Sequence, residues 1–224
     1  MIEILLWATM AFFGMMVLTP SAGTAVKQGP DRAAAQRGAR DVSQALGWPE
    51  LEPFLDAAAH RESRWHPSAG ARRVGTNGAI GMWQVIPTTA FPTRGMRKEF
   101  TRAEAIALGG RLLDPQVNAA AIGDYLVSLR SWNPDATLGE LRAAMFVPEF
   151  VRGRPTGLAP AGRLRDRFPT AEAWADRFDL SLSEFDKSIE VSGVDVDPSA
   201  PANFPSGRIP PVSELAAQIG ARLT

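Results

Sequence analysis

Apolar residues recur at helical spacing along most of the chain, whereas the alternation typical of strands is nearly absent. Leu51, Phe54, Leu55 and Ala58 follow the i, i+3, i+4, i+7 pattern of one helix face. With the positions of Pro and Gly, such patterns predict helices over residues 31–46, 49–62, 115–129, 138–147, 171–178, 182–189 and 212–223. We therefore expect a mainly α fold.

The charges of the chain balance, with 24 Lys and Arg against 24 Asp and Glu. Binding nucleic-acid phosphates needs a basic excess or a basic patch, so no nucleic-acid partner is expected. Because the chain has no Cys, disulfides, thiolate metal sites and a thiol nucleophile are excluded. His60 and His66 flank Glu62 without the His-Glu-x-x-His spacing of a zinc helix, so we expect no metal and no cofactor.

Residues 4–26 carry no charge, and residues 4–18 are almost wholly apolar. This length lies between the roughly 7–15 residues of a signal-peptide core and the roughly 20 residues of a membrane span. Small residues at 23–25 suit a cleavage site, but no basic residue precedes the apolar run. We favour a retained membrane anchor over a cleaved signal. The basic residues within 27–40 would then keep the rest of the chain on the cytoplasmic side.

Glu62 lies eleven residues after Leu51, almost a whole number of helical turns, and so continues the apolar stripe at the last turn of its helix. Asp56 and Glu52 are expected to point elsewhere. Burial raises the pKa of a carboxyl group, and a raised pKa suits a general acid. The alternative is a structural ion pair of Glu62 with one of the nearby arginines, Arg61, Arg64 or Arg72.

A glycine-rich stretch follows that helix and cannot form a long helix itself. Gly78 and Gly81 would let the backbone approach a ligand closely. Trp83 offers a flat apolar face, and Gln84 offers both a donor and an acceptor. This mixture suits a sugar ring, although such a loop is as often a structural crossing, and Trp83 is alternatively a core residue.

Several separate motifs in order resemble those of the soluble lytic transglycosylase family. They are Glu62-Ser63, then Pro67 with Ala69, then the stretch 78–90 that holds Gly78-Ala79, Gly81 and Gln84, then Asp114-Pro115 with Asn118, and finally Tyr125-Leu126. The resemblance covers residues 51–150. It implies a lysozyme-like helical fold and cleavage of the MurNAc–GlcNAc bond of peptidoglycan. It also implies Glu62 as the catalytic acid and base, with Ser63, Gly78, Ala79, Gly81, Trp83, Gln84, Asn118 and Tyr125 as substrate-binding residues.

Two positions depart from the family pattern. Trp83 stands where the family usually has Met. The later Ala-Tyr-Asn segment of the family, whose Tyr helps to hold the catalytic Glu, is replaced here by residues 143–148 without Tyr or Asn. Either another group supports Glu62, or the site is less active than its relatives.

The absence of acidic residues from 63–98 bears on the product, because hydrolysing glycosidases normally use two carboxylates. A lytic transglycosylase instead lets the MurNAc 6-hydroxyl attack C1, which gives a 1,6-anhydro sugar. Asp114 and Asp124 are possible second carboxylates, although Asp114 is better placed as a helix cap. The alternatives are a lysozyme-type hydrolase and a glycan-binding scaffold without turnover.

The expected domains are an anchor or signal (1–26), a connecting helix (27–48), a transglycosylase-like domain (49–152), a helical extension (153–192) and a Pro-rich linker with a short terminal helix (193–224). The expected partners are glycan strands, a membrane through residues 4–26, and other virion or envelope-complex proteins. An ordinary cellular transglycosylase must face the periplasm, yet the charges beside the expected anchor favour the cytoplasm. Delivery in a phage particle reconciles the two, and a host envelope or conjugation enzyme is the alternative.

Overall fold

The computed structural model describes residues 29–93, 98–157, 160, 163–208, 210–221 and 223. The apolar segment 4–26, expected to be an anchor or signal, lies outside this part of the chain. Over the described residues, no helix is both long and apolar enough to cross a membrane. Their β pairing consists of two isolated bridges, so the expectation of a mainly α fold is confirmed.

Nine α-helices and four short 3-10 helices (η) occur in the described residues. In chain order they are α1 (Arg32–Leu46), α2 (Leu51–Ser63), η1 (Ala71–Arg73), α3 (Pro87–Ala90), α4 (Arg102–Ala107), η2 (Leu108–Leu113), α5 (Pro115–Ser128), η3 (Leu129–Ser131), α6 (Leu138–Ala144), η4 (Pro148–Arg152), α7 (Arg163–Arg167), α8 (Ala171–Ser192) and α9 (Val212–Gln218).

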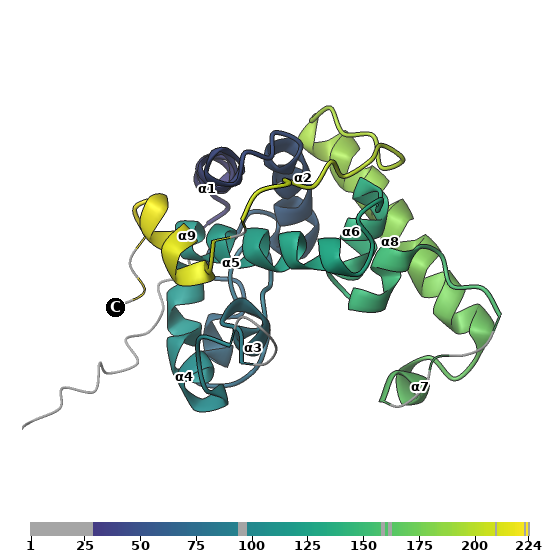
Figure 1. Ribbon diagram of the computed structural model, residues 1–224, viewed down its shortest axis with the longest axis horizontal. Coiled ribbons are helices and arrows are strands. Elements are labelled where there is room, and N and C mark those ends of the chain that lie inside the picture. The colour runs from purple at the N-terminus through teal and green to yellow at the C-terminus, as the bar shows by residue number, and fades with distance from the viewer. Residues whose placement is uncertain are drawn as a thin grey trace, which may run out of the picture.

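Helix α5 lies at the centre of the fold, with α1 and α2 on one side and α3 and α4 on the other (Figure 1). Ten of its fourteen residues are buried, from Val117 to Val127. A helix that is apolar nearly all round is a core helix, which explains this central place. The carboxylate of Asp114 caps its start by accepting hydrogen bonds from the backbone N–H groups of Gln116 and Val117 at 2.8 and 3.3 Å.

The helix boundaries follow local chemistry. Asp31 caps α1, and Gly47 ends it in the left-handed conformation with φ 63°. Helix α2 begins at Leu51, two residues later than the expected start at Pro49. Helix α6 ends at Ala144 and not at Val147, because a residue before proline is disfavoured in helical conformation.

Helix α8 corrects one expectation. The sequence predicts two short helices over 171–178 and 182–189, but the chain forms one continuous helix of 22 residues. Thr170 caps its start and Gly193 ends it, and no Pro or Gly interrupts it. Its N-terminal half builds a second small core, in which Phe150 packs on Trp174 and Phe178 with ring centroids 4.5 and 5.4 Å apart.

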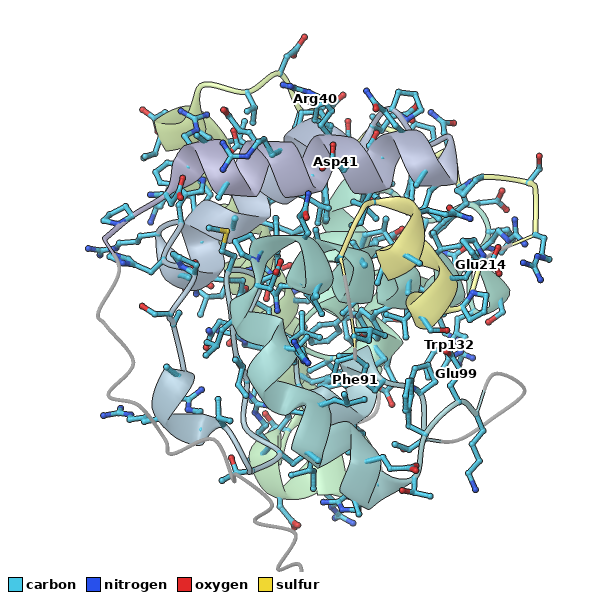
Figure 2. The ribbon with its side chains drawn as sticks, turned by 90° about the vertical axis from the view of Figure 1, so that its left-hand side faces the viewer. Arg40, Asp41, Phe91, Glu99, Trp132 and Glu214 are labelled. Atoms are coloured by element: carbon cyan, nitrogen blue, oxygen red, sulfur yellow. The ribbon has the colours of Figure 1, made fainter. Side chains whose placement is uncertain are left out.

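Segment 193–211, expected to be a Pro-rich linker, forms no helix over residues 193–208 and 210–211 but lies against the body. Trp48 packs on Phe204 with ring centroids 5.2 Å apart and donates its indole N–H to the carbonyl of Ala202 at 2.5 Å. The segment leads into α9, which packs on α5 and α1 (Figure 2). Within α9, the Ser213 hydroxyl donates a hydrogen bond to the Glu99 carboxylate at 2.8 Å.

Candidate functional site

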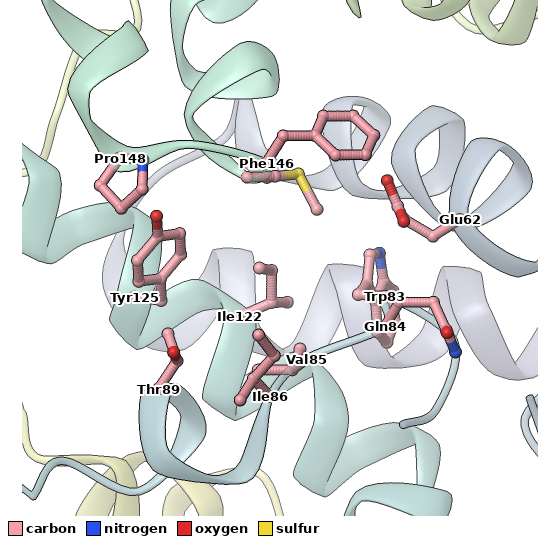
Figure 3. A pocket seen from close by; sticks show the side chains of 11 residues that line it. Glu62, Trp83, Gln84, Val85, Ile86, Thr89, Ile122, Tyr125, Phe146 and Pro148 are labelled. Carbon is pink, nitrogen blue, oxygen red and sulfur yellow. The ribbon is translucent and has the colours of Figure 1, made fainter. Parts of the chain in front are cut away.

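The last turn of α2 places Glu62 at a pocket (Figure 3). The helix ends because Arg64 and Trp65 adopt left-handed conformations, with φ 53° and 59°. This turn is held by the Trp65 backbone N–H, which donates to the carbonyl of Ala59 at 3.3 Å. The side chain of Glu62 is 13% exposed, so it lies at the boundary between the core and the solvent-accessible pocket.

The pocket has a volume of about 140 Å³ and lies between α2, α3, α5 and the segment after α6. Glu62, Trp83 and Gln84 lie at one end of it in Figure 3, and Tyr125 and Thr89 lie towards the other. The walls between are largely apolar. The lining residues are Glu62, Trp83, Gln84, Val85, Ile86, Thr89, Ile122, Tyr125, Met145, Phe146 and Pro148.

The glycine-rich stretch reaches the pocket through a tight turn. Ile80 and Val85 exchange two backbone hydrogen bonds of 3.0 Å, which closes the turn around Gly81. Gly81 has φ 81°, and a Cβ added there would lie 2.2 Å from the Leu112 carbonyl oxygen. The close approach that Gly81 allows is therefore to the protein itself and not to a ligand.

Asn118 is a structural residue at the same turn. It is fully buried, accepts the backbone N–H of Trp83 at 2.8 Å and donates to the carbonyl of Ile80 at 3.1 Å. These two bonds join α5 to the turn. Asn118 does not line the pocket, so its contribution to the site is to fix the position of residues 80–84.

Trp83 is a core residue that reaches the pocket. Only 1% of its surface is exposed, and its indole N–H donates to the carbonyl of Leu55 at 2.8 Å. Gln84, the next residue, has φ 49° and donates its side-chain N–H to the Gly81 carbonyl at 2.8 Å. Of these two residues, Gln84 is the less buried.

Tyr125 lines the pocket from α5. Its hydroxyl donates to the carbonyl of Ala144 at 2.8 Å, which joins α5 to the end of α6. Burial raises the pKa of this phenol, and the nearby charge of Glu149 adds to the increase. Tyr125 is therefore a neutral hydrogen-bonding group at any ordinary pH.

Three other expected site residues lie away from the pocket lining. The Ser63 hydroxyl donates to the Ala59 carbonyl at 3.2 Å and accepts the backbone N–H of His66 at 3.1 Å, so it stabilises the end of α2. Gly78 packs against the side chain of Arg73, and the Ala79 carbonyl accepts a hydrogen bond from that arginine at 3.2 Å. Gly78 and Ala79 therefore contribute to the shape of the loop.

Arg142 is a residue beside the pocket that sequence reasoning missed. Its Nη2 donates to Glu62 Oε1 at 2.5 Å, and its side chain is 0% exposed. Burial lowers the pKa of the guanidinium, and the charge of Glu62 opposes this decrease. The signal was present in the sequence, because Arg142 stands four residues after Leu138 on the apolar stripe of its helix.

Three guanidinium groups approach the ring of Phe146, which lines the pocket beside Glu62 (Figure 3). The Cζ atoms of Arg177, Arg142 and Arg61 lie 4.3, 4.6 and 5.8 Å from the ring centroid. Arg61 also forms an ion pair with Glu184 of α8. Helices α2, α6 and α8 thus meet in one charged and aromatic cluster behind the pocket.

Glu62 is the one carboxylate among the described residues that line the pocket. Asp114 is occupied as the cap of α5. Asp124 is buried in α5 and does not line the pocket. No group of three His, Cys, Asp or Glu side chains that could hold a metal ion occurs in the described part of the chain.

The carboxylate Asp56, six residues before Glu62 on α2, corrects another expectation. The sequence pattern places it away from the core, but it is buried and accepts hydrogen bonds from Arg32, Gln36 and Trp65. The ring of Trp65 packs on His60 with centroids 4.6 Å apart and the ring planes tilted by 45°. Burial lowers the pKa of His60, with the charges of Arg64 and Arg32 adding to the decrease and that of Asp56 opposing it.

Comparison of this chain with protein-family models, curated proteins and solved structures finds no match in any of the three.

Proposed function

We propose that this protein is a peptidoglycan lytic transglycosylase of lysozyme-like fold, with Glu62 as its catalytic acid and base. The observation that supports this most is the position of Glu62 as the one carboxylate on the described pocket. The apolar walls and the polar groups of Gln84 and Tyr125 supply the mixed surface that a sugar ring requires. The motifs that resemble the transglycosylase family meet at this pocket through Glu62, Gln84 and Tyr125.

In the proposed reaction, Glu62 first donates a proton to the oxygen between MurNAc and GlcNAc, and the bond from MurNAc C1 to that oxygen breaks. Glu62, now a carboxylate, takes the proton from the MurNAc 6-hydroxyl. That oxygen attacks C1 and closes the 1,6-anhydro ring. No water is consumed, and Glu62 ends in its initial protonation state.

A single carboxylate supports this route over ordinary hydrolysis. Retaining and inverting glycosidases place a second carboxylate roughly 5–9.5 Å from the first. Attack by a hydroxyl of the substrate itself removes the need for this group. The pocket lining offers only Glu62 among the described residues, as the proposed reaction requires.

A glycan-binding protein without turnover is the second candidate. It is favoured by the ion pair between Glu62 and the fully buried Arg142, an arrangement also typical of structural pairs. In this case the pocket would bind glycan strands, and Glu62 would stabilise the fold through its ion pair with Arg142.

The proposed cellular setting follows from the N-terminal sequence. The uncharged residues 4–26 would attach the protein to a membrane or embed it in a virion, and the site would act on the wall or in the periplasm. Delivery in a phage particle, among other virion proteins, remains our first proposal, and an envelope or conjugation complex of the host is the alternative. N-terminal sequencing of the mature protein tests this, because a chain starting near Val26 in a periplasmic fraction would contradict virion delivery.

The reaction itself is tested by incubating the full-length protein with purified peptidoglycan and analysing the products by mass spectrometry. Muropeptides with 1,6-anhydro ends, lighter than reducing ends by one water, support the proposal. Reducing ends would identify a lysozyme-type hydrolase. Intact sacculi with bound protein would identify the non-catalytic alternative.

A further inference from the structure

We propose that Arg142 is a positioning residue of the reaction, which holds the Glu62 carboxylate towards the pocket without touching the glycan. This inference rests on the proposed function. Arg142 Nη2 lies 2.5 Å from Glu62 Oε1, and Arg142 does not line the pocket. Any effect of Arg142 on a bound glycan must therefore pass through the pocket residues that it contacts, Glu62 and Phe146.

The environment of Arg142 is unfavourable for a residue with a purely structural role. Its side chain is fully buried, and its Nε and Nη1 atoms have no hydrogen-bond partner among the described residues. A buried charge with one hydrogen bond leaves a desolvation penalty that a well-packed apolar residue would avoid. Buried polar atoms without partners, as in Arg142, are expected at functional sites, where geometry outweighs stability.

Phe146 completes the arrangement. Its ring lies 4.6 Å from the guanidinium of Arg142 and also lines the pocket beside Glu62 (Figure 3). The ring stabilises the buried cation and restricts the direction in which the guanidinium can present its hydrogen bond. Phe146 lies in segment 143–148, which stands where the family carries Ala-Tyr-Asn, and Arg142 directly precedes this segment. The two residues would thus supply a different support for the catalytic carboxylate.

Fixing the carboxylate matters because Glu62 has three rotatable bonds and accepts a hydrogen bond from Arg142 alone among the described residues. A misplacement of about 1 Å costs on the order of 100-fold in rate when a group must meet a reacting atom.

Arg177 of α8 supplies a matched control. Its guanidinium lies 4.3 Å from the same Phe146 ring, but it is not hydrogen-bonded to Glu62. Replacing either arginine by Met removes one charge from the cluster and keeps an apolar chain. Only Arg142→Met removes the contact to Glu62.

The experiment compares full-length wild type, Arg142→Met, Arg142→Lys, Arg177→Met and Glu62→Gln on soluble peptidoglycan fragments, with thermal unfolding of each variant. We expect Arg142→Met to lower kcat by about 100-fold, with KM within about twofold, because the group acts through Glu62. Arg142→Lys should recover part of this loss, and Arg177→Met should stay near wild type.

A kcat of Arg142→Met equal to that of Arg177→Met would overturn the inference while leaving the proposed function intact. A rise in KM with unchanged kcat would overturn it too, since it would assign Arg142 to glycan binding. If Arg142→Met does not fold, the kcat of Arg142→Lys is compared with that of Arg177→Met instead. Equal values would again overturn the inference. A wild type that releases no muropeptides, or an active Glu62→Gln, would overturn the proposed function together with this inference.

Discussion

Helix α2 carries two carboxylates that each pair with an arginine, and the two regions around them are built differently. Asp56 accepts hydrogen bonds from Arg32, Gln36 and Trp65 at 2.8–2.9 Å, and its side chain is 3% exposed. Glu62 accepts one from Arg142 alone among the described residues, and its side chain borders the pocket.

This difference separates a structural from a chemically available carboxylate. The oxygens of Asp56 are occupied by protein donors, so it is expected to stabilise the packing of α1 on α2. Glu62 keeps one oxygen without a protein donor among the described residues, at a surface that a ligand can reach. Burial and pairing are common to both, so what distinguishes the candidate acid is its incomplete set of partners.

The largest expected difference between Asp56 and Glu62 appears when each carboxylate is neutralised. We expect Glu62→Gln to lower cleavage of peptidoglycan by about 10²–10⁴-fold, the usual contribution of a general acid–base group. Asp56→Asn, assayed at a temperature where it is folded, should keep activity within a few-fold of wild type. Equal losses at equal folded fractions would show that the two regions do not differ in this way.

The same two side chains are also expected to differ in how much they stabilise the fold. Asp56→Ala removes the side-chain acceptor shared by Arg32, Gln36 and Trp65, and the loss of hydrogen bonds to a charged group costs about 1.5–3 kcal/mol. Glu62→Gln should cost less than Glu62→Ala by about 1.5–3 kcal/mol, because the amide oxygen can still accept from Arg142. Denaturant unfolding of the three variants measures these differences, and an Asp56→Ala protein as stable as wild type would contradict the structural role.

Trp83 tests whether the pocket wall near Glu62 belongs to the core or to the ligand surface. Trp83→Phe keeps most of the apolar volume but removes the hydrogen bond from the indole N–H to the Leu55 carbonyl, a loss of about 0.5–1.5 kcal/mol. We expect lower stability with binding of chitooligosaccharides within a few-fold of wild type. Unchanged stability with strongly weakened binding would instead place Trp83 in contact with the sugar.

The smallest effect concerns pH and the region around Asp56. Because the pKa of His60 is lowered from 6.5 in the folded state, the unfolded state binds more protons in the window below 6.5. The contribution of His60 to the free energy of unfolding is therefore retained above pH 6.5 and is lost as the pH falls below 6.5. His60→Phe keeps the ring against Trp65 and should lose less stability between pH 7 and 5. Identical pH dependence of the two unfolding free energies would contradict this.

The sequence pattern predicted the ends of helices well where a capping residue, a glycine or a proline determines them. The limits of α1 follow from Asp31 and Gly47, and Asp114 with Pro115 starts α5 as expected. The single helix α8 was missed because short apolar patterns were interpreted separately, although no helix breaker divides them.

The site was predictable only in part. The stripe that begins at Leu51 leads to Glu62, which lies in the last turn of α2 at the edge of the core, but the same reasoning placed Asp56 outside the core. Helix α2 packs against both α1 and α8, and the small residues 57–59 let these neighbours approach and bury a second side of it. Arg142 lies 80 residues from Glu62, so no spacing rule connects the two.

The most direct test of the central assignment is a crystal structure of Glu62→Gln with a peptidoglycan oligosaccharide. We expect a sugar in the pocket between Gln84 and Tyr125, with its glycosidic oxygen within about 2.6–3.2 Å of the side-chain amide at position 62. A glycan bound on another face, with the pocket free of sugar, would contradict the assignment of Glu62 as the catalytic acid.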